Sequence, residues 1–246
     1  MPNSPILDKS VLWRINTGRI ESQEPRHADV VEAILSSGLA TEVVRLLSGG
    51  KEADVYLARY GSGPLVVKVY RLYRTSHRGG RPVRADVLGW RAAHEYEMLH
   101  QAWKGGIRVP TPARREEQML SMRYLGTEEG PAPRLHDVVL EEPAALLEEI
   151  LTATEAMARA GVVHGDFSAY NILLHEGHPW FIDFSEAFRV DRNRGAPRQR
   201  LDEASAFLTH GLEALGRYFR RYGLTIDVEP FVERVVHALD RFGLLS

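Results

Sequence analysis

Three strand-like segments follow one another early in the chain, and the turns between them are too short to hold a helix. They span residues 43–47, 54–60 and 65–70 and are joined by the turns SGGKEA and GSGP. Parallel neighbours need a crossover of a dozen or more residues, so these turns specify an antiparallel sheet. A helix is expected just before the sheet, over residues 28–38, because Val31, Ile34 and Leu35 share one helical face and Gly38 follows them.

The chain becomes mainly helical from Pro143 onward. We expect a helix over residues 87–104, a strand over 118–126, a Gly- and Pro-rich hinge over 126–134, a helix over 143–161, a hairpin over 171–184 and final helices near 202–222 and 228–242. In the helix over 143–161 one face carries the residues expected to be buried, namely Leu147, Ile150, Leu151, Thr154, Met157 and Ala158. Strands first and helices later predict an α+β fold of two lobes, residues 1–122 and residues 123–246.

The composition excludes several classes of site. The chain has 246 residues, enough for one large domain or two lobes, and no cysteine, which rules out disulfides, cysteine-bound zinc, iron–sulfur clusters and thiol nucleophiles. Its net charge of −2 indicates no particular partner. No run approaches the ~18 apolar residues of a membrane span and no leader segment is visible. We therefore expect a cytoplasmic protein that does not contact membranes.

A Gly-rich turn stands between the first two strands, in LLSGGKEADVYLARY. Glycines let the backbone approach a phosphate group and present its N–H groups to it. The turn matches neither the strand-to-helix phosphate loop nor G-x-G-x-x-G. An ordinary hairpin turn explains it equally well, because glycine marks turns of every kind.

Lys68 and Glu95 are each unusual for their surroundings. Lys68 stands in mid-strand among valines, where a lysine either reaches solvent from an edge strand or serves a ligand. Glu95 falls in the middle of an apolar helical stripe, whereas Glu97 falls on the opposite side of the helix. A buried carboxylate needs a partner, and the mid-strand lysine is a candidate. A strand lysine held by a helix glutamate is how protein kinases bind nucleotide phosphates.

The stretch VVHGDFSAYNILL places a carboxylate and a carboxamide between two apolar segments. Asp166 precedes Asn171 by five residues, and Asp183 follows a predicted hairpin. In kinase-type phosphotransferases the first aspartate orients the acceptor, while the asparagine and the second aspartate bind metal ions. These oxygen ligands suit Mg²⁺. Turn residues at Asp166 and Asn171 and a helix cap at Asp183 are the alternative interpretation of each residue alone.

These motifs together resemble the RIO family of atypical protein kinases. The matching text is SGGKEADVY, VVKVYR, HEYEMLHQAWKGGIRVPTP, HGDFSAYNILL and FIDFSEA, and it runs from about residue 43 to the C-terminus. The resemblance implies a shortened two-lobed kinase fold that binds ATP between its lobes, without a peptide-docking activation segment. It further implies a flexible loop at residues 71–86 and a stand-alone catalytic domain with a short N-terminal extension.

The resemblance also implies a role for each matching residue. Asp166 would be the catalytic carboxylate, and Asn171 and Asp183 would bind metal. The residues implied in ATP binding are Ser48, Lys51, Lys68, Glu95, Met122 as gatekeeper, Arg123, Tyr124 and Leu125 as hinge, and Ser168. Mg²⁺ is the implied metal, with Mn²⁺ as an alternative.

Two positions depart from the family pattern near the catalytic loop. Ala169 replaces the glutamate of Ser-x-Glu-Tyr-Asn, and Gly211 falls where the family has an aspartate that supports this loop. The resemblance therefore implies that the loop is braced differently here.

The sequence leaves three functions open. The leading hypothesis is an ATP- and Mg²⁺-dependent serine/threonine kinase, or an ATPase that passes phosphate transiently to Asp183. The second is a small-molecule phosphotransferase of the antibiotic-kinase type, which the missing docking segment permits. The third is a nucleotide-dependent RNA- or ribosome-binding module that uses the arginines of residues 71–86, although such a charge run is often only solvated. The five arginines are Arg71, Arg74, Arg78, Arg81 and Arg84.

Overall fold

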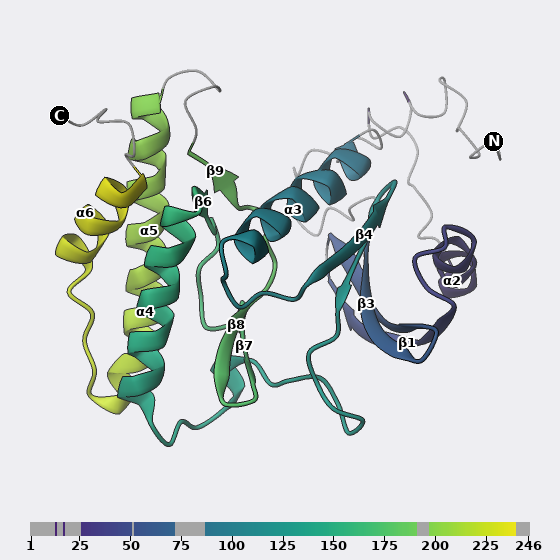
Figure 1. Ribbon diagram of the computed structural model, residues 1–246, viewed down its shortest axis with the longest axis horizontal. Coiled ribbons are helices and arrows are strands. Elements are labelled where there is room, and N and C mark those ends of the chain that lie inside the picture. The colour runs from purple at the N-terminus through teal and green to yellow at the C-terminus, as the bar shows by residue number, and fades with distance from the viewer. Residues whose placement is uncertain are drawn as a thin grey trace. The chain divides into compact units, whose positions relative to one another are not determined.

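The structure is a computed structural model that describes residues 13, 17, 26–50, 52–71, 87–190 and 197–239 (Figure 1). The chain divides into two compact units, one formed by residues 1–94 and 113–124 and the other by residues 95–112 and 125–246. Both units are therefore built from discontinuous stretches, and helix α3 (Val87–Lys104) contributes to both. The predicted single boundary at residues 122 and 123 stays a prediction.

The first unit is a five-stranded antiparallel sheet in the order β1-β2-β3-β5-β4, with helix α2 against it (Figure 1). Its elements are α2 (His27–Ser36), β1 (Glu42–Gly49), β2 (Ala53–Tyr60), β3 (Gly63–Tyr70), β4 (Pro112–Glu116) and β5 (Met119–Arg123). The short turns made this meander antiparallel, as predicted. The sequence reading missed β4, because PARRE has no apolar alternation. A short, charged strand suits an outermost position, where it discourages pairing with other chains.

One face of this sheet forms the core of the first unit. Val30 and Ile34 of α2 pack with Tyr56, Val67 and Val69 in one buried cluster. Side chains alternate along a strand, so Lys68, between two of these valines, faces the other side of the sheet. The α2 core thus fixes which face of β3 carries the lysine.

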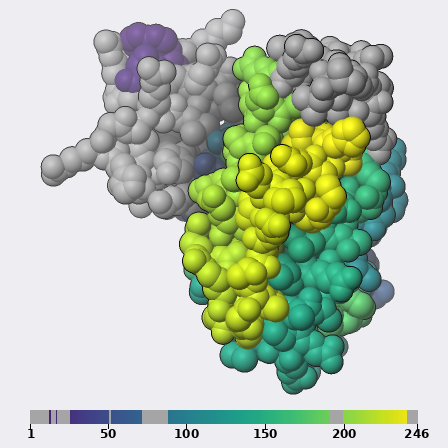
Figure 2. All heavy atoms as spheres, turned by 90° about the vertical axis from the view of Figure 1, so that its left-hand side faces the viewer, coloured from purple at the N-terminus to yellow at the C-terminus, as the bar shows by residue number. Residues whose placement is uncertain are grey.

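The second unit is mainly helical and carries two small two-stranded sheets, β6–β9 and β7–β8. Its elements are η1 (Leu135–Asp137), α4 (Pro143–Arg159), β6 (Val162–Val163), β7 (Ile172–His175), β8 (His178–Phe181), β9 (Phe188–Arg189), α5 (Pro197–Phe219), η2 (Arg220–Tyr222) and α6 (Val228–Leu239). Figure 2 shows α6 lying over α4 and α5 on one face of this unit. The β7–β8 hairpin holds the predicted strand pair, with a two-residue turn between His175 and His178.

Two details of the helices differ from the sequence reading. Leu146 is buried in α4, whereas Leu151 is only half-buried, since neighbours contact α4 over more than one narrow stripe. Helix α5 begins at Pro197, five residues before the expected position 202. Proline suits a first helical position, because the N–H that it lacks would have had no partner there.

Candidate active site

Lys68 lies on the central strand of the first unit. Strand β3 pairs with β2 on one side and β5 on the other, which places Lys68 opposite Val55 and Leu120. An edge-strand lysine that reaches solvent is therefore excluded. Directly opposed residues point to the same face of a sheet, so all three side chains share the face opposite α2.

Ser48 lies in line with Val55 and Lys68 across the strands of the sheet. It pairs with Val55, which itself pairs with Lys68. Neighbouring strands lie about 4.8 Å apart, so the backbones at Ser48 and Lys68 are about 10 Å apart across the sheet. The register thus sets two of the expected ATP-binding residues on one face of the first unit.

The Gly-rich turn between β1 and β2 is held by several polar contacts. The N–H of Gly50 donates to the carbonyl of Ala53 at 2.9 Å. The Arg71 guanidinium contacts the carbonyl of Gly50 and forms an ion pair with Asp54 at 3.1 Å. Arg91 of α3 forms a further ion pair with Glu52 at 2.7 Å.

Arg71 and Arg91 have positions that the sequence reading missed. Arg71 belongs by sequence to the basic run of residues 71–86, yet its side chain contacts Gly50 and Asp54 of the Gly-rich turn. The sequence feature that could have indicated this contact is the position of Arg71 directly after β3. The other four arginines of that loop, and the expected phosphate-loop residue Lys51, lie outside the described residues.

The expected gatekeeper Met122 and the hinge residue Arg123 end β5, and the hinge residues Tyr124 and Leu125 follow it. Met122 pairs with Val66 and is buried, as are Tyr124 and Leu125. Burial raises the pKa of the Tyr124 hydroxyl. The Leu125 carbonyl accepts a hydrogen bond from the N–H of Ala132 at 2.9 Å, which closes the loop of residues 126–131.

Glu95 is buried, as its place on the helix predicted. Its exposed fraction is 2%, and Ala92, Leu99 and Ala102 on the same stripe are at 2% or less. Glu97 is exposed. Lys68 and Glu95 belong to different units, so the predicted ion pair between them stays a prediction.

Asp166 and Asn171 contact each other within the second unit. The Asn171 side-chain N–H₂ donates to Asp166 Oδ2 at 2.8 Å and to the Asp166 backbone carbonyl at 2.9 Å. The Asn171 backbone N–H donates to Ser168 at 3.0 Å, which shapes the turn between the two. With its amide nitrogen used in this way, Asn171 has its amide oxygen to offer a cation.

His164 connects this loop to the strand that leads to Asp183. Its Nε2 donates to the carbonyl of Ile182 at 3.0 Å, and its ring packs on Phe184 with centroids 4.7 Å apart. Burial lowers the pKa of the imidazole, although the carboxylates of Asp183 and Asp166 oppose that effect. A neutral ring that donates through Nε2 has a bare Nδ1, and this atom has no hydrogen-bond partner in the described part of the chain.

Two backbone conformations bring the loop and the Asp183 turn together. Gly165 has a φ of +80°, and a Cβ at this position would lie 2.0 Å from the carbonyl oxygen of Glu186. Only glycine fits such a close approach. Asp183 itself has a φ of 63°, which residues with side chains seldom adopt. No described helix begins between Asp183 and Pro197, so the helix-cap interpretation of Asp183 fails.

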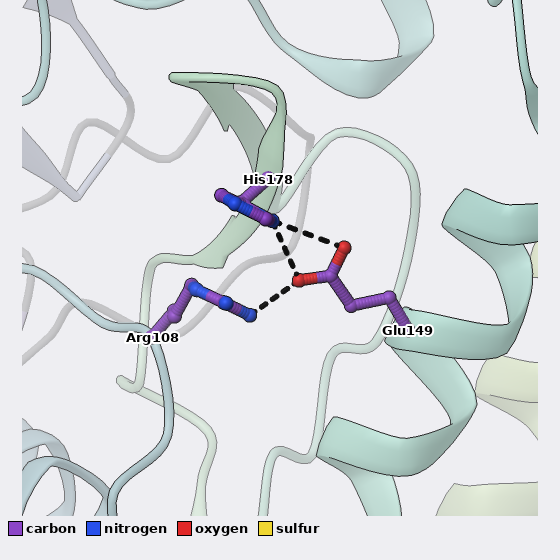
Figure 3. A network of polar contacts seen from close by, with 3 residues as sticks. All are labelled: Arg108, Glu149 and His178. Atoms are coloured by element: carbon purple, nitrogen blue, oxygen red, sulfur yellow. Dashed lines mark hydrogen bonds and ion pairs between the residues drawn. The ribbon is translucent and has the colours of Figure 1, made fainter.

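A polar network anchors the hairpin that separates Asn171 from Asp183 (Figure 3). Glu149 of α4 contacts Arg108 and accepts from His178 Nδ1 at 2.9 Å. The backbone carbonyl of Arg108 also accepts from the N–H of Phe181 at 2.9 Å. These contacts fix both ends of β8 against α4 and residue 108.

Tyr170 and His136 form a second contact beside the catalytic loop, which the sequence reading did not find. Their rings stack at 4.1 Å, and the Tyr170 hydroxyl lies 2.8 Å from His136 Nε2. His136 Nδ1 lies 3.0 Å from Asp137, and the His136 backbone N–H donates to the carbonyl of Ala169. Ala169 is thus fixed through its backbone.

The oxygen-bearing residues of the second unit suit magnesium. Among the described residues, no three His, Cys, Asp or Glu side chains gather to hold a metal by themselves. Mg²⁺ usually takes only one or two protein oxygens and completes its shell with phosphate and water. Two groups fit such a site, namely the side-chain amide oxygen of Asn171 and the carboxylate of Asp183. Their segments are joined through the backbone, because the N–H of Ile182 donates to the backbone carbonyl of Asn171.

Comparisons with known proteins point to one family. A family model described as the RIO domain matches residues 54–231. The chain is 30% identical over 208 residues to a RIO-type serine/threonine-protein kinase Rio1 of Haloferax volcanii, covering 77% of this chain and 67% of the relative. It is 29% identical over 217 residues to the human serine/threonine-protein kinase RIO1, covering 78% of this chain and 38% of the relative.

A solved structure shares the fold. The Rio2 kinase from Chaetomium thermophilum, crystallised as an ADP/Mg²⁺-phosphoaspartate complex, matches 96% of this chain and 76% of its own, with a TM-score of 0.68 and 19% identity. The α+β kinase-like fold is therefore confirmed. The chain spans less than half of the human relative and about two thirds of the archaeal one. None of the helices within the described ranges has the length and apolar character of a membrane span.

Proposed function

This chain belongs to the RIO family, and from that premise we propose that it transfers the γ-phosphoryl group of ATP to a serine or threonine hydroxyl in the presence of Mg²⁺. Its relatives from Haloferax and human are named serine/threonine-protein kinases. The observation that carries the proposal is the bond from Asn171 to Asp166 Oδ2 at 2.8 Å. That bond holds an exposed carboxylate in a fixed orientation beside a candidate metal ligand.

Each residue of the proposed site has one task. Asp166 accepts the proton of the acceptor hydroxyl while the hydroxyl oxygen bonds to the γ-phosphorus and the bond to ADP breaks. Lys68, with Glu95 as its partner, neutralises phosphate charge, and Ser48, Lys51 and Ser168 contact the nucleotide. Met122, Tyr124 and Leu125 form the adenine side. Bound Mg²⁺, held by Asn171 and Asp183, would supply further neutralisation of the phosphate oxygens.

An ATPase cycle uses the same residues. In it the Asp183 carboxylate attacks the γ-phosphorus, ADP leaves, and water later cleaves the acyl phosphate to regenerate Asp183. The phosphoaspartate of the Chaetomium Rio2 complex supports this route by analogy of fold. Mn²⁺ is a proposed substitute for Mg²⁺ in either reaction.

Incubation with γ-labelled ATP and Mg²⁺ tests the proposal. For the kinase reaction we expect acid-stable label on serine or threonine of a protein acceptor. For the ATPase reaction we expect free phosphate, no acid-stable and base-labile label, and a hydroxylamine-sensitive label on the chain itself. Asp166→Asn and Lys68→Met should each reduce turnover by at least about 100-fold. Arg59→Ala, an exposed change on β2, is the matched control and should leave turnover unchanged. Unaltered turnover in both site variants would overturn the mechanism.

The remaining functions stay predictions, and each has its own distinguishing result. Label on a small metabolite would identify a small-molecule phosphotransferase. Salt-dependent RNA binding, lost when Arg74, Arg78, Arg81 and Arg84 are replaced, would identify an RNA- or ribosome-binding module. Arg71 is less suited to bind RNA, because its guanidinium contacts Asp54 and Gly50. A cytoplasmic location also stays a prediction.

A further inference from the structure

Helix α5 lies against the catalytic loop at Gly211. A Cβ built at this position would lie 2.7 Å from Cβ of Phe167, 3.1 Å from its carbonyl oxygen and 3.5 Å from its Cα. Carbon atoms in contact are normally 3.5–4.0 Å apart. The absent side chain of Gly211 is therefore what lets the helix touch the residue directly after Asp166.

The contact lies on the buried seam of α5. The seam consists of Leu201, Ala204, Leu208, Gly211, Leu212, Leu215 and Phe219, all of them buried. Residues at this spacing share one helical face. Because leucines fix the depth of α5 on either side of Gly211, the helix cannot rotate or lift at one position to make room for a side chain.

Phe167 is also confined from its other side. Its ring stacks on Phe181 with centroids 5.7 Å apart and meets the edge of His164 at 6.0 Å. The small cavity that it lines with His164 has a volume of about 10 Å³, which holds at most one water molecule. A side chain at position 211 would therefore displace the backbone of the catalytic loop, because the ring of Phe167 has almost no free space to move into.

From this geometry we propose that Gly211 is a positioning residue, whose lack of a side chain sets where the catalytic loop, and with it Asp166, is held. The proposal deepens the proposed function and rests on it for its kinetic part. Displacing Phe167 displaces the adjacent Asp166 and presses on Phe181, two residues before Asp183. A shift of about 1 Å in a catalytic group can reduce a rate by about 100-fold.

Gly216 offers a matched control on the same helix. Within the described ranges, a Cβ at Gly216 would meet only Ile226 Cδ1, at 4.0 Å. Alanine favours a helix over glycine, so Gly216→Ala should raise Tm by about 2–4 °C and leave turnover unchanged. Gly211→Ala should lower kcat by about 100-fold and change KM for ATP much less, because Ser48 and Lys68 lie in the first unit.

Hydrogen exchange followed by mass spectrometry tests the contact without relying on catalysis. Gly211→Ala should speed exchange in peptides covering residues 162–175, whereas Gly216→Ala should not. Normal exchange in this segment, or equal kcat values for the two variants, would overturn the proposal. If the wild-type chain proves inactive, the proposed function fails, and the exchange comparison still decides the contact.

A double-mutant comparison adds a stability test of the same contact. The closest approach is to Cβ of Phe167, so Gly211→Ala should cost less stability in a Phe167→Gly chain than in the wild type, where a failure to fold counts as a cost at least equal to the whole stability of the chain. Equal costs in the two backgrounds would contradict the proposal.

Discussion

The imidazole of His164 donates from Nε2 to the carbonyl oxygen of Ile182 at 3.0 Å. His164 stands two residues before Asp166, and Ile182 stands directly before Asp183. This single bond therefore joins the two segments that carry the proposed catalytic carboxylate and the proposed metal ligand. Burial disfavours the charged form of this imidazole in the folded chain.

Stability should fall as the solution becomes acidic, because of His164. Burial lowers the pKa of its imidazole in the folded chain, so the unfolded chain takes up the proton first as pH falls. The stability contributed by the neutral ring is present above the unfolded pKa of about 6.5 and decreases below it, by at most about 1.4 kcal/mol per pH unit. Denaturant unfolding at a series of pH values from 7.5 to 5 measures how steeply the free energy of unfolding falls with pH.

The control for this slope is His164→Gln, whose longer side chain places an amide nitrogen near the position of Nε2, can donate to Ile182 and does not titrate. It should flatten the pH dependence between about 6.5 and 5. Equal slopes for the two chains would show that other groups cause the loss.

Asn171→Asp should abolish the fixed orientation of Asp166. The change replaces a donor 2.8 Å from Asp166 Oδ2 with a second carboxylate, which repels the first. We expect kcat to fall by at least about 100-fold, with a stability loss of about 1 kcal/mol because the site is exposed. Steady-state kinetics and thermal unfolding measure the two effects. Glu186→Gln, an exposed change nearby, should alter neither.

Asp183→Gly should separate stability from activity. Its φ of 63° is strained for aspartate and for alanine but not for glycine, so Asp183→Gly should be more stable than Asp183→Ala by about 1 kcal/mol. Asp183→Gly should nevertheless lose phosphate turnover, because the carboxylate is gone. Chemical unfolding and ATP turnover of the same preparation decide the matter.

Glu176 is the matched position for that experiment. It has a φ of 54° in the two-residue turn of the β7–β8 hairpin, followed by Gly177 at 77°. Two positive φ values mark a type I′ turn, in which Asn-Gly is preferred. Glu176→Asn should add about 0.5–1 kcal/mol of stability and leave turnover unchanged. A loss of stability here would disprove the strain argument for both residues.

Arg71→Ala should weaken ATP binding more than chemistry. The guanidinium holds the Gly-rich turn through Asp54 and the Gly50 carbonyl, and a loosened turn contacts phosphates less well. We expect KM for ATP to rise about tenfold with kcat little changed, which marks an interaction made equally in the ground and transition states. Asp54→Ala should act in the same direction, and the two effects should not add. Purely additive effects would contradict the shared role of this ion pair.

The sequence predicted the parts of the site that depend on local periodicity. Glu95 could be placed inside because a helix repeats every 3.6 residues, and its 2% exposure agrees. The same holds for the antiparallel meander, which follows from turn length. These features need no knowledge of distant segments.

Other features depend on which segments meet, and a sequence pattern does not specify that. Lys68 could have been on an edge strand until the pairing of β3 with β5 made β3 central. The stacking of Tyr170 on His136 and the approach of Gly211 to Phe167 join residues 34 and 44 positions apart, so neither leaves a local signature. Position 211 stands out only through the family resemblance, which indicates that a supporting aspartate is missing. It does not indicate a close contact with Phe167.

The discontinuity of the first unit has a consequence during synthesis. Strand β3 acquires its second neighbour only from residues 119–123, which follow the whole of α3. Until that segment leaves the ribosome, the nascent sheet ends at β3, with a row of unpaired backbone groups beside Lys68. A gene fragment that stops at residue 94 would leave this edge open permanently and should give an aggregating product. The shortest usable expression fragment of the first unit therefore has to extend through residue 124.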